Sequence, residues 1–299
     1  MHTRIQEHMK AFQKQNKNRG RLLIHCADQP GIVAAVSEFL FGYGANIMES
    51  SQYSTNPERG TFFIRIEFEC SELQEKEQEM KAQFRGIAEK FEMRWKFVYV
   101  HEVKRTAIFV SKEPHCLLEL LWEWQSGDLM TDIALVISNH EDAREITEAL
   151  RIPFYHVPAS KENRAEAEAK HKELLQEYDI DLIVLARYMQ ILTPDFVASY
   201  PNRIINIHHS FLPAFVGARP YERAYERGVK LIGATSHYVT NDLDEGPIIE
   251  QDIKRVNHRD NVEDLKKIGR SIERSVLARA VKWHLEDRII VHGNKTIVF

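Results

Sequence analysis

Two patterns of apolar and polar positions follow one another along the chain, and the change falls near residue 102. From residue 20 to 101 the spacing predicts strands and helices in the order β, α, β, β, α, β. The strands are expected at 21–26, 46–53, 61–69 and 93–100, and the helices at 32–41 and 71–91. Residues 61–69 alternate most strongly, with Arg65 and Glu67 at the polar positions. This order predicts a ferredoxin-like split βαβ sandwich.

From residue 106 onward, short apolar runs alternate with longer amphipathic ones. Strands are expected at 106–110, 133–138, 154–157, 180–185 and 203–207, and helices at 116–125, 141–150 and 161–178. Such alternation predicts a doubly wound, mostly parallel Rossmann-like sheet with helices on both faces. A long amphipathic helix is expected at 262–285, followed by strands at 288–292 and 295–298 around the turn Gly293-Asn294.

The length of 299 residues fits two domains, each large enough to bury its own core. We expect a small N-terminal domain at 20–101 and a larger C-terminal domain at 102–299. Residues 1–19 are polar, contain several basic side chains and lack an apolar centre. They are therefore expected to be a loosely ordered N-terminal extension rather than a targeting segment.

Composition narrows the class of protein. A net charge of -4 argues against nucleic acid as the main partner, since no basic excess exists to neutralise phosphates. The apolar runs are short and broken by charges, so we expect no membrane partner and a cytoplasmic protein. Cys26, Cys70 and Cys116 are widely spaced, odd in number and outside any CxxC motif, which predicts reduced thiols and makes a nucleophilic cysteine improbable.

Candidate chemistry concentrates around the strand at 203–207. Residues two apart on a strand share a face, so Asn206 and His208 should leave this strand on the same side. Burying an amide and an imidazole is costly unless partners or a ligand meet them. Asp244 follows later, in the turn Asp242-Leu-Asp-Glu-Gly-Pro247. An amide donor, an imidazole and a carboxylate form a set that can polarise and attack a carbonyl group.

These residues carry a resemblance to a known family. Asn206 and His208 with the following SFLP, and the DxGPI of Asp244 to Ile248, resemble the folate-dependent formyl hydrolase and formyltransferase family. This family includes glycinamide ribonucleotide transformylase and methionyl-tRNA formyltransferase, and the similarity runs from roughly residue 105 to 255. The N-terminal DxPG turn, helix and GANI sequence are similar to the ACT regulatory domain.

The resemblance implies a reaction at the formyl group of 10-formyltetrahydrofolate. Asn206 would donate a hydrogen bond to the formyl oxygen, and His208 would stabilise the oxyanion as an imidazolium or as a proton donor. Asp244 would orient His208 and position or deprotonate the attacking water. His237 would contact these residues without touching the substrate. Beyond the folate substrate itself, no cofactor is implied.

The sequence Leu185-Ala-Arg-Tyr-Met-Gln-Ile-Leu192 resembles the segment of the family that holds the pterin ring. By this resemblance, the apolar wall of the folate pocket and its backbone contacts would come from Leu185, Met189, Gln190, Ile191, Leu192, Phe196, Val197, Val239, Thr240, Asn241 and Asp242. An apolar pocket with a few placed polar groups suits such a ligand. The alternative is that these residues fill the space between a strand and a helix.

The acceptor of the formyl group is the point that separates the members of this family. Transformylases hold a nucleotide phosphate in a glycine-rich loop after the first strand, whereas the matching segment here, Val110 to Cys116, has no glycine and contains Glu113. The sequence therefore favours water as the acceptor. The resemblance then implies that the formate is supplied for purine biosynthesis and that one-carbon folate pools are kept in balance. A formyltransferase to a small amine, or a catalytically silent folate-binding regulator, remains the alternative.

The ACT resemblance implies a small amino-acid effector and a homo-oligomer. The turn residues Asp28 and Gly31, together with Asn46, would form the regulatory site. The alternative is a ferredoxin-like domain that serves only as an oligomer contact, with Asp28 capping the turn.

Metal and nicotinamide chemistry fit the sequence poorly. The adjacent His208 and His209 are expected to point to opposite sides of a strand, and no HxH or HExxH spacing occurs. No GxGxxG follows the first strand of the large sheet. We therefore expect no metal and no nicotinamide cofactor.

Overall fold

The computed structural model describes residues 2–56, 60–160, 162–214 and 219–299. The chain forms two compact units. One consists of Lys104–Leu285, Gly293–Thr296 and the first residues through Ile5. The other consists of Gln6–Val103, Glu286–His292 and Ile297–Phe299. The sequence placed all of 286–299 in the C-terminal domain, whereas most of this segment belongs to the unit of the N-terminal sheet.

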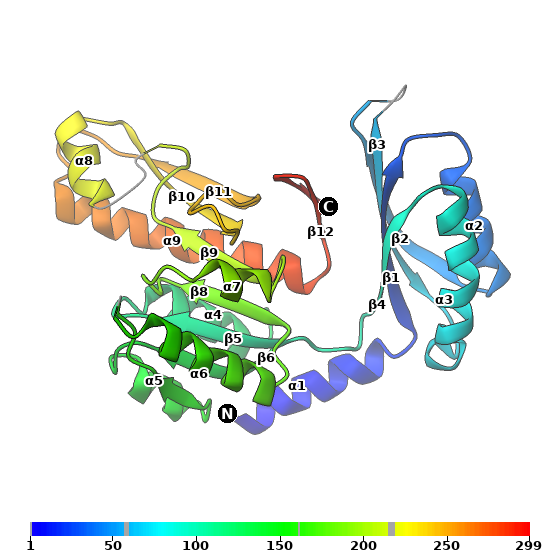
Figure 1. Cartoon of the computed structure of the whole chain (residues 1–299), viewed down its shortest axis with the longest axis horizontal. Helices are drawn as coiled ribbons and strands as arrows, with labels where there is room; N and C mark the ends of the chain where they lie inside the picture. Colours follow the sequence, from blue (N-terminus) through cyan, green and yellow to red (C-terminus); the bar gives the residue numbers. More distant parts are fainter. Residues whose placement is uncertain (1, 57–59, 161, 215–218) are drawn as a thin grey trace. The chain divides into compact units, whose positions relative to one another are not determined.

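The N-terminal unit contains a four-stranded antiparallel sheet in the order β2-β3-β1-β4. Its strands are β1 (Arg19–Ala27), β2 (Asn46–Ser54), β3 (Thr61–Glu69) and β4 (Arg94–Tyr99), and its helices are α2 (Ile32–Gly42) and α3 (Leu73–Lys90). Both helices lie on one face of the sheet, where apolar side chains of α2, α3, β1, β3 and β4 form a core (Figure 1). The predicted β, α, β, β, α, β order is confirmed.

The other face of this sheet is covered by the C-terminal segment. Ile290, Ile297 and Phe299 pack against Leu23, Phe63 and Val98. Alternation along β3 placed Arg65 among polar, outward positions, yet Arg65 is only 3% exposed. Its Nε donates to the carbonyl of Asp287 at 3.0 Å, so the returning chain buries this guanidinium. The cause is a tertiary contact that no local pattern contains.

Residues 2–15 form a helix, α1 (His2–Gln15), so the expectation of a loosely ordered arm is wrong. Ile5, Met9, Phe12 and Asn16 recur at helical spacing and are the more buried positions of this stretch. The carbonyl of Phe12 accepts from both the backbone N of Asn16 at 3.0 Å and the Asn16 side chain at 2.8 Å, which fixes the end of the helix.

The C-terminal unit is built on a seven-stranded sheet in the order β11-β10-β9-β8-β5-β6-β7. The strands are β5 (Arg105–Val110), β6 (Asp132–Ser138), β7 (Phe154–His156), β8 (Leu182–Ala186), β9 (Ile204–His208), β10 (Leu231–Tyr238) and β11 (Ile248–Arg255). Strands β5 to β9 are parallel, and β10 and β11 run antiparallel at one edge. The predicted Rossmann-like, mostly parallel fold is confirmed.

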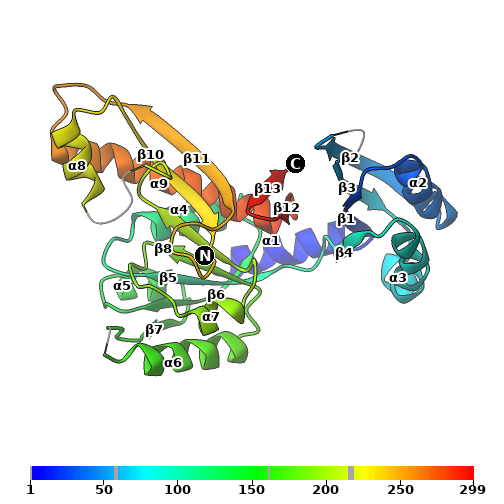
Figure 2. The same ribbon diagram turned by 45° about the horizontal axis from the view of Figure 1, so that its top comes forward.

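Helices cover both faces of this sheet. They are α4 (His115–Ser126), α5 (Arg144–Ala149), α6 (Arg164–Glu177), α7 (Pro194–Ala198), α8 (Pro220–Arg227) and α9 (Val262–Leu285). Helices α6 and α7 share one core with the strands, and α4 and α9 pack together on the opposite face (Figures 1 and 2). A hairpin of β12 (Ile289–His292) and β13 (Lys295–Val298) ends the chain.

Several helical details differ from the sequence analysis. Helix α5 begins at Arg144, three residues after the expected start. Helix α6 begins at Arg164, and residue 161, where the expected helix began, lies outside the described residues. The short helices α7 and α8 were not predicted. Both begin with a proline in the first turn, which suits a helix start but reads as a loop in a sequence pattern.

The topology fixes where a ligand should bind. From β5 the chain continues to β6 and β7 on one side, and β8 and β9 lie on the other. The carboxyl ends of β5, β8 and β9 therefore meet beside the point where the strand order reverses, which is the usual place for ligands in such sheets.

No helix among the described residues is long and apolar enough to cross a membrane. Cys26, Cys70 and Cys116 are buried free thiols, and burial raises the pKa of each. A thiol that is hard to ionise is a poor nucleophile.

Candidate active site

The polar residues of β9 meet a histidine of the neighbouring strand. In the antiparallel pairing of β9 with β10, Asn206 stands opposite His237. The Asn206 Nδ2 lies 3.2 Å from the His237 Nε2, and the His237 Nδ1 lies 2.9 Å from the carbonyl oxygen of Tyr238. A carbonyl can only accept, so the Nδ1 carries the proton and the Nε2 of a neutral His237 accepts from Asn206. The amide of Asn206 thereby keeps one N–H for another partner.

Asp244 reaches these residues from the turn that follows β10. Its Oδ2 lies 3.2 Å from the His208 Nδ1, and its Oδ1 lies 3.6 Å from the His237 Nε2. The turn is tight, because a Cβ on Gly246 would lie 1.8 Å from the carbonyl oxygen of Tyr238. Glycine is therefore required for the approach that directs Asp244 towards the sheet. The structure thus brings together Asn206, His208, Asp244 and His237.

The electrostatics of this group favour an ionised carboxylate. Burial by itself would raise the pKa of Asp244, but the hydrogen bond and charge of His208 outweigh it and hold this pKa well below its ordinary value. His208 is only 6% exposed, and its Nε2 is buried without a hydrogen-bond partner among the described residues. A buried imidazole nitrogen with no partner is costly, so a ligand group is expected to meet it.

His209 does not point away from His208 as expected. The two rings stack, with centroids 5.1 Å apart and an angle of 26° between their planes. Strand β9 ends at His208, so the alternation of a strand no longer applies to the next residue. Burial and the neighbouring charge of Arg187 lower the pKa of His209 to about 4, which keeps this ring neutral.

The segment after β8 presents apolar side chains beside this group. Arg187 and Met189 both have positive φ, 66° and 55°, which non-glycine residues rarely adopt. Met189 is 59% exposed and Ile191 is 53% exposed. Exposed apolar side chains on a constrained segment form a surface suited to a flat, largely apolar ligand.

The other expected pocket residues fall into two groups. Leu185, Phe196 and Val197 are buried in the core beneath the segment, where the space-filling alternative describes them well. Partly buried or exposed positions are Gln190, Leu192, Val239, Thr240, Asn241 and Asp242. Thr240 Oγ1 donates to the carbonyl of Asp242 at 3.2 Å and shapes the second loop.

Two residues that the sequence analysis did not identify, Glu168 and Ser111, hold the segment after β8 in place through hydrogen bonds. Glu168 of α6, only 7% exposed, accepts from the backbone N of Thr193 at 2.7 Å and from the Thr193 hydroxyl. Ser111 donates from its backbone N to the carbonyl of Arg187 and from its hydroxyl to the carbonyl of Tyr188. Glu168 lies in the helix that the sequence predicts at 161–178, where charged residues are frequent, and only its tertiary partner distinguishes it.

A cluster of ionisable residues lies close to the candidate site. Glu273 of α9 is 1% exposed; its Oε2 lies 2.8 Å from His115 Nε2, and its Oε1 accepts from the Tyr221 hydroxyl at 2.6 Å. Burial would raise the pKa of Glu273, but His115, Arg187 and Tyr221 lower it to about 2. Glu273 was not singled out in the sequence, because it sits in an ordinary amphipathic helix.

This cluster also contains a group with metal-ligand geometry. Ligand atoms of His115, Cys116 and Glu273 lie within 4.8 Å of one another, and no other such group occurs in the described part of the chain. The donor set fits a metal poorly. Burial raises the pKa of Cys116 far above its ordinary value, and the Arg187 Nε lies 3.5 Å from Glu273. A protonated thiol and a neighbouring guanidinium both oppose a cation.

In the N-terminal unit, the residues of the DxPG turn take defined positions. Gly31 precedes α2 with φ 95°, a conformation that favours glycine. Asp28 accepts a hydrogen bond from the Ser54 hydroxyl, and Asn46 is an exposed residue at the start of the edge strand β2.

The fold and this site define a class. Residues 104–281 match the formyl transferase family model, and residues 20–85 match the ACT domain model. The chain is therefore a formyl transferase family protein with an N-terminal ACT domain.

More particular relatives share the whole arrangement. The chain is 68% identical to the formyltetrahydrofolate deformylase of Bacillus subtilis (strain 168) over 299 residues, which is 100% of both chains. A crystal structure of a formyltetrahydrofolate deformylase from Pseudomonas syringae pv. tomato str. DC3000 matches 94% of both chains with a TM-score of 0.90 and 48% identity. Glycinamide ribonucleotide transformylase 1 from Symbiobacterium toebii matches 66% of this chain and 94% of its own, with a TM-score of 0.63 and 33% identity. The chain belongs to the formyltetrahydrofolate deformylase family.

Proposed function

We propose that this enzyme hydrolyses 10-formyltetrahydrofolate to formate and tetrahydrofolate, and that Asn206, His208 and Asp244 carry out the reaction. The observation that supports these roles best is the pairing of Asp244 with the Nδ1 of His208 at 3.2 Å, while the Nε2 of His208 has no partner in the described structure. An imidazole held by a carboxylate on one nitrogen presents the other nitrogen to a substrate.

The formyl oxygen would receive two hydrogen bonds. One comes from the amide N–H of Asn206 that His237 leaves unused, and the other comes from the Nε2–H of His208. When water adds to the formyl carbon, negative charge develops on this oxygen. Donors already fixed in place stabilise that charge without reorganisation, which is commonly the largest contribution to such a reaction.

The role of Asp244 follows from its low pKa. A carboxylate that holds a proton weakly is a poor base in the free enzyme, but it is a strong partner for an imidazolium and a good acceptor for the hydrogen of a water molecule. We therefore assign Asp244 to orienting His208 and the attacking water. As the C–N10 bond breaks, N10 takes up a proton from the added water through the same pair, and formate departs.

The folate would lie on the segment after β8. Met189 and Ile191 offer apolar contact for the ring, and the loop of Val239 to Asp242 offers backbone groups from the opposite side. Glu168 and Ser111 hold the segment in place before the ligand arrives, which lowers the cost of ordering on binding.

The acceptor distinguishes this proposal from its alternatives. The connection from β5 to α4 contains Glu113 and begins α4 after Pro114 without a side-chain cap, so it offers no glycine-rich phosphate cradle. A transferase to a small amine would need that amine for turnover. A silent folate-binding regulator would bind folate and release nothing.

The test is to mix the purified full-length protein with 10-formyltetrahydrofolate and no amine, and to measure formate by a coupled dehydrogenase assay. Formate should appear in equal amount to the tetrahydrofolate formed. Turnover that appears only after glycinamide ribonucleotide is added would favour the transferase. Tight folate binding without formate at any protein concentration would favour the regulator. His208→Ala should reduce formate release strongly in the same assay.

For the N-terminal domain, we infer a small amino-acid effector bound near Asp28, Gly31 and Asn46, together with self-association. The supporting features are the ACT match, the positive φ at Gly31 and the exposed edge strand β2. Isothermal titration with single amino acids, with Asp28→Ala as the comparison, tests the effector. Light scattering with and without the bound amino acid tests the assembly.

A further inference from the structure

A cavity adjoins the proposed reaction centre. Met189, assigned above to folate contact, forms part of its wall, but the arginine side chains of this wall have no part in the mechanism above. The cavity has a volume of about 310 Å³ and lies at the carboxyl ends of β5, β8 and β9. Residues from the connection after β5, the segment after β8, the start of α8 and the middle of α9 line it. We call it the arginine cavity, because Arg187, Arg219 and Arg270 contribute to its wall together with Lys266.

The wall of the arginine cavity has more cationic than acidic side chains. Its acidic members are Glu113, Glu222 and Glu273. Glu222 lies 3.3 Å from Lys266, and Glu273 is enclosed by protein donors. Neither Arg219 nor Arg270 forms an ion pair within 4.0 Å with another described residue. The cavity therefore attracts an anion and repels a protonated amine.

Arg187 carries the strongest indication of a missing partner. Its Nε lies 3.5 Å from the Glu273 Oε2 without a hydrogen bond, and within the described structure neither its Nε nor its Nη1 has a hydrogen-bond partner although both are buried. The two oxygens of Glu273 are already engaged by His115 and Tyr221. A guanidinium with unused, shielded donors matches the two oxygens of a carboxylate.

The cavity is also placed where the reaction releases its acid. His209 lines it, and the His209 ring stacks on that of His208 at 5.1 Å. His209 therefore lies between two sets of charges. Arg187 and Glu273 belong to the arginine cavity, and His208 and Asp244 belong to the proposed reaction centre. Formate that forms beside Asp244 is repelled by this carboxylate, whereas Arg187 attracts it.

We propose that the arginine cavity is a subsite for formate, in which Arg187 holds the product carboxylate after the C–N bond has broken. This rests on the proposed hydrolysis, because the formate must form at the neighbouring centre. The same positive wall disfavours a protonated amine next to the formyl carbon, which makes the cavity a specificity device as well as a product site.

The first experiment uses the wild-type protein without folate. Sodium formate is titrated while the thermal midpoint is followed, with sodium chloride at equal ionic strength and sodium phosphate as parallel arms. Formate should raise the midpoint in a saturable way, and chloride should not. An equal effect of chloride would overturn the proposal, and a stronger, Arg187-dependent effect of phosphate would reassign the cavity to another oxyanion. Because no turnover is needed, this result is separate from the test of hydrolysis.

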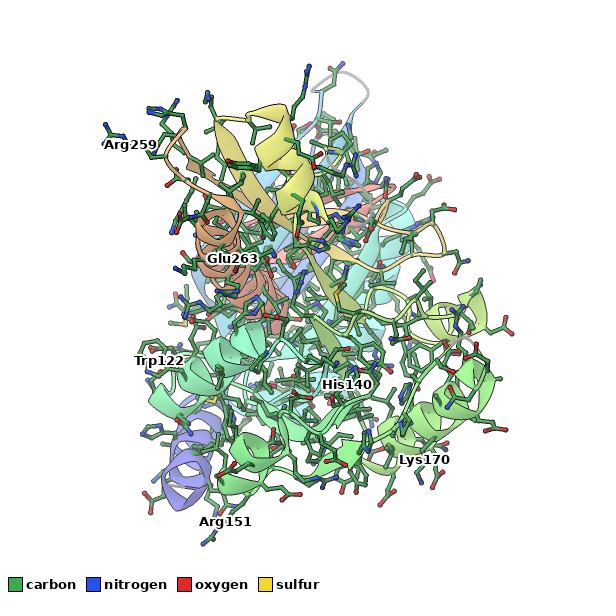
Figure 3. All side chains as sticks on the ribbon, turned by 90° about the vertical axis from the view of Figure 1, so that its left-hand side faces the viewer. Trp122, His140, Arg151, Lys170, Arg259 and Glu263 are labelled. Carbon is green, nitrogen blue, oxygen red and sulfur yellow. The ribbon has the colours of Figure 1, made fainter. Side chains whose placement is uncertain are left out.

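The second experiment measures inhibition of the initial rate by formate in Arg187→Gln. The inhibition constant should rise at least about tenfold relative to wild type, the effect of losing one charge-assisted hydrogen bond. Arg259→Gln is the matched control, because this exposed side chain points away from the loop before α9 and lies outside the cavity (Figure 3). An unchanged inhibition constant in Arg187→Gln would show that Arg187 does not bind formate.

A third variant, Arg270→Gln, tests the same proposal if Arg187→Gln does not fold. Arg270 lines the cavity without an ion pair in the described structure, so Arg270→Gln should leave the fold intact. Loss of one cation from the wall should weaken inhibition by formate about two- to threefold. Equal inhibition of Arg270→Gln, Arg259→Gln and wild type would contradict the electrostatic basis of the proposal.

Discussion

The Oδ2 of Asp244 lies 3.2 Å from the Nδ1 of His208, although one residue stands in a turn and the other ends a buried strand. Asp244 has φ 58°, in the left-handed region. Aspartate and asparagine tolerate this conformation better than most residues, because their short polar side chains bond locally. The turn thus fixes a carboxylate at the sheet edge with little freedom to move, and the pair is ready before substrate binds.

Asp244→Asn should reduce formate release by at least about a thousandfold, the upper part of the usual range for a lost acid-base partner. Asparagine suits the same backbone conformation and keeps the size of the side chain, but it cannot balance an imidazolium. Binding of tetrahydrofolate, measured by fluorescence titration, should stay within about threefold of wild type. Glu245→Gln, which removes a charge from an exposed neighbour, is the control. Near wild-type turnover in Asp244→Asn would remove the assigned role.

Glu168→Gln should weaken folate binding. The carboxylate of Glu168 accepts from both the backbone N and the hydroxyl of Thr193, and a glutamine presents one acceptor and one donor to these two groups. If the segment loses about 1–2 kcal/mol of the free energy that holds it in its binding conformation, KM should rise roughly 5- to 30-fold. Glu166→Gln, on an exposed position of the same helix, should change neither KM nor kcat. A fall in kcat at constant KM would contradict the positioning role.

The contribution of Glu273 to the free energy of unfolding should decrease in acid. In the folded state the pKa of Glu273 is lowered from 4.5 to about 2, with burial opposed by His115, Arg187 and Tyr221. A lowered pKa stabilises the fold above pH 4.5, and this contribution is lost as the pH falls from 4.5 towards 2. At neutral pH it amounts to about 3 kcal/mol by linkage.

The measurement compares the free energy of unfolding of wild type and Glu273→Gln at pH 7 and pH 3.5. The difference should shrink by roughly 1 kcal/mol at the lower pH. Glu263→Gln, at an exposed position of the same helix, should show no such pH dependence. A constant difference between the two pH values would mean that the pKa of Glu273 is the same in the folded and the unfolded protein.

The larger elements follow from local patterns, and the site follows only in part. Helix α9 begins and ends where the apolar spacing of 262–285 predicts, and β3 matches 61–69. Asn206 and His208 were expected to share a face because of the strand period, and Asp244 was joined to them through a family motif. The stacking of His208 on His209 depends on where β9 ends, which the period does not contain.

Contacts between distant segments could not be derived in the same way. Arg187 and Glu273 meet because the segment after β8 and the middle of α9 converge at one sheet edge, and nothing local marks either residue. The meeting of Tyr221 with Glu273 also depends on Gly269, because a Cβ at that position would lie 2.0 Å from the Tyr221 hydroxyl oxygen. Local spacing predicts that α9 is amphipathic, but it does not say which residue fills the gap left by its glycine.

The C-terminal turn should influence catalysis although it is exposed. Asn294 Nδ2 donates to the carbonyl of Glu245 at 2.9 Å, and Thr296 Oγ1 donates to the carbonyl of Ile248 at 2.6 Å. Both acceptors lie within a few residues of Asp244. The double variant Asn294→Ala with Thr296→Val removes two hydrogen bonds. Together these bonds stabilise the conformation of the turn around Asp244 by about 1–3 kcal/mol.

Because this order positions Asp244 rather than the folate, kcat should fall about 5- to 50-fold while KM changes less than about threefold. Lys295→Ala, at the exposed position between the two residues, serves as the control and should behave like wild type. Hydrogen exchange of residues 242–248 should rise in the double variant and not in the control. Unchanged exchange together with unchanged kcat would show that the turn of Asp244 holds its shape without support from the C-terminal hairpin.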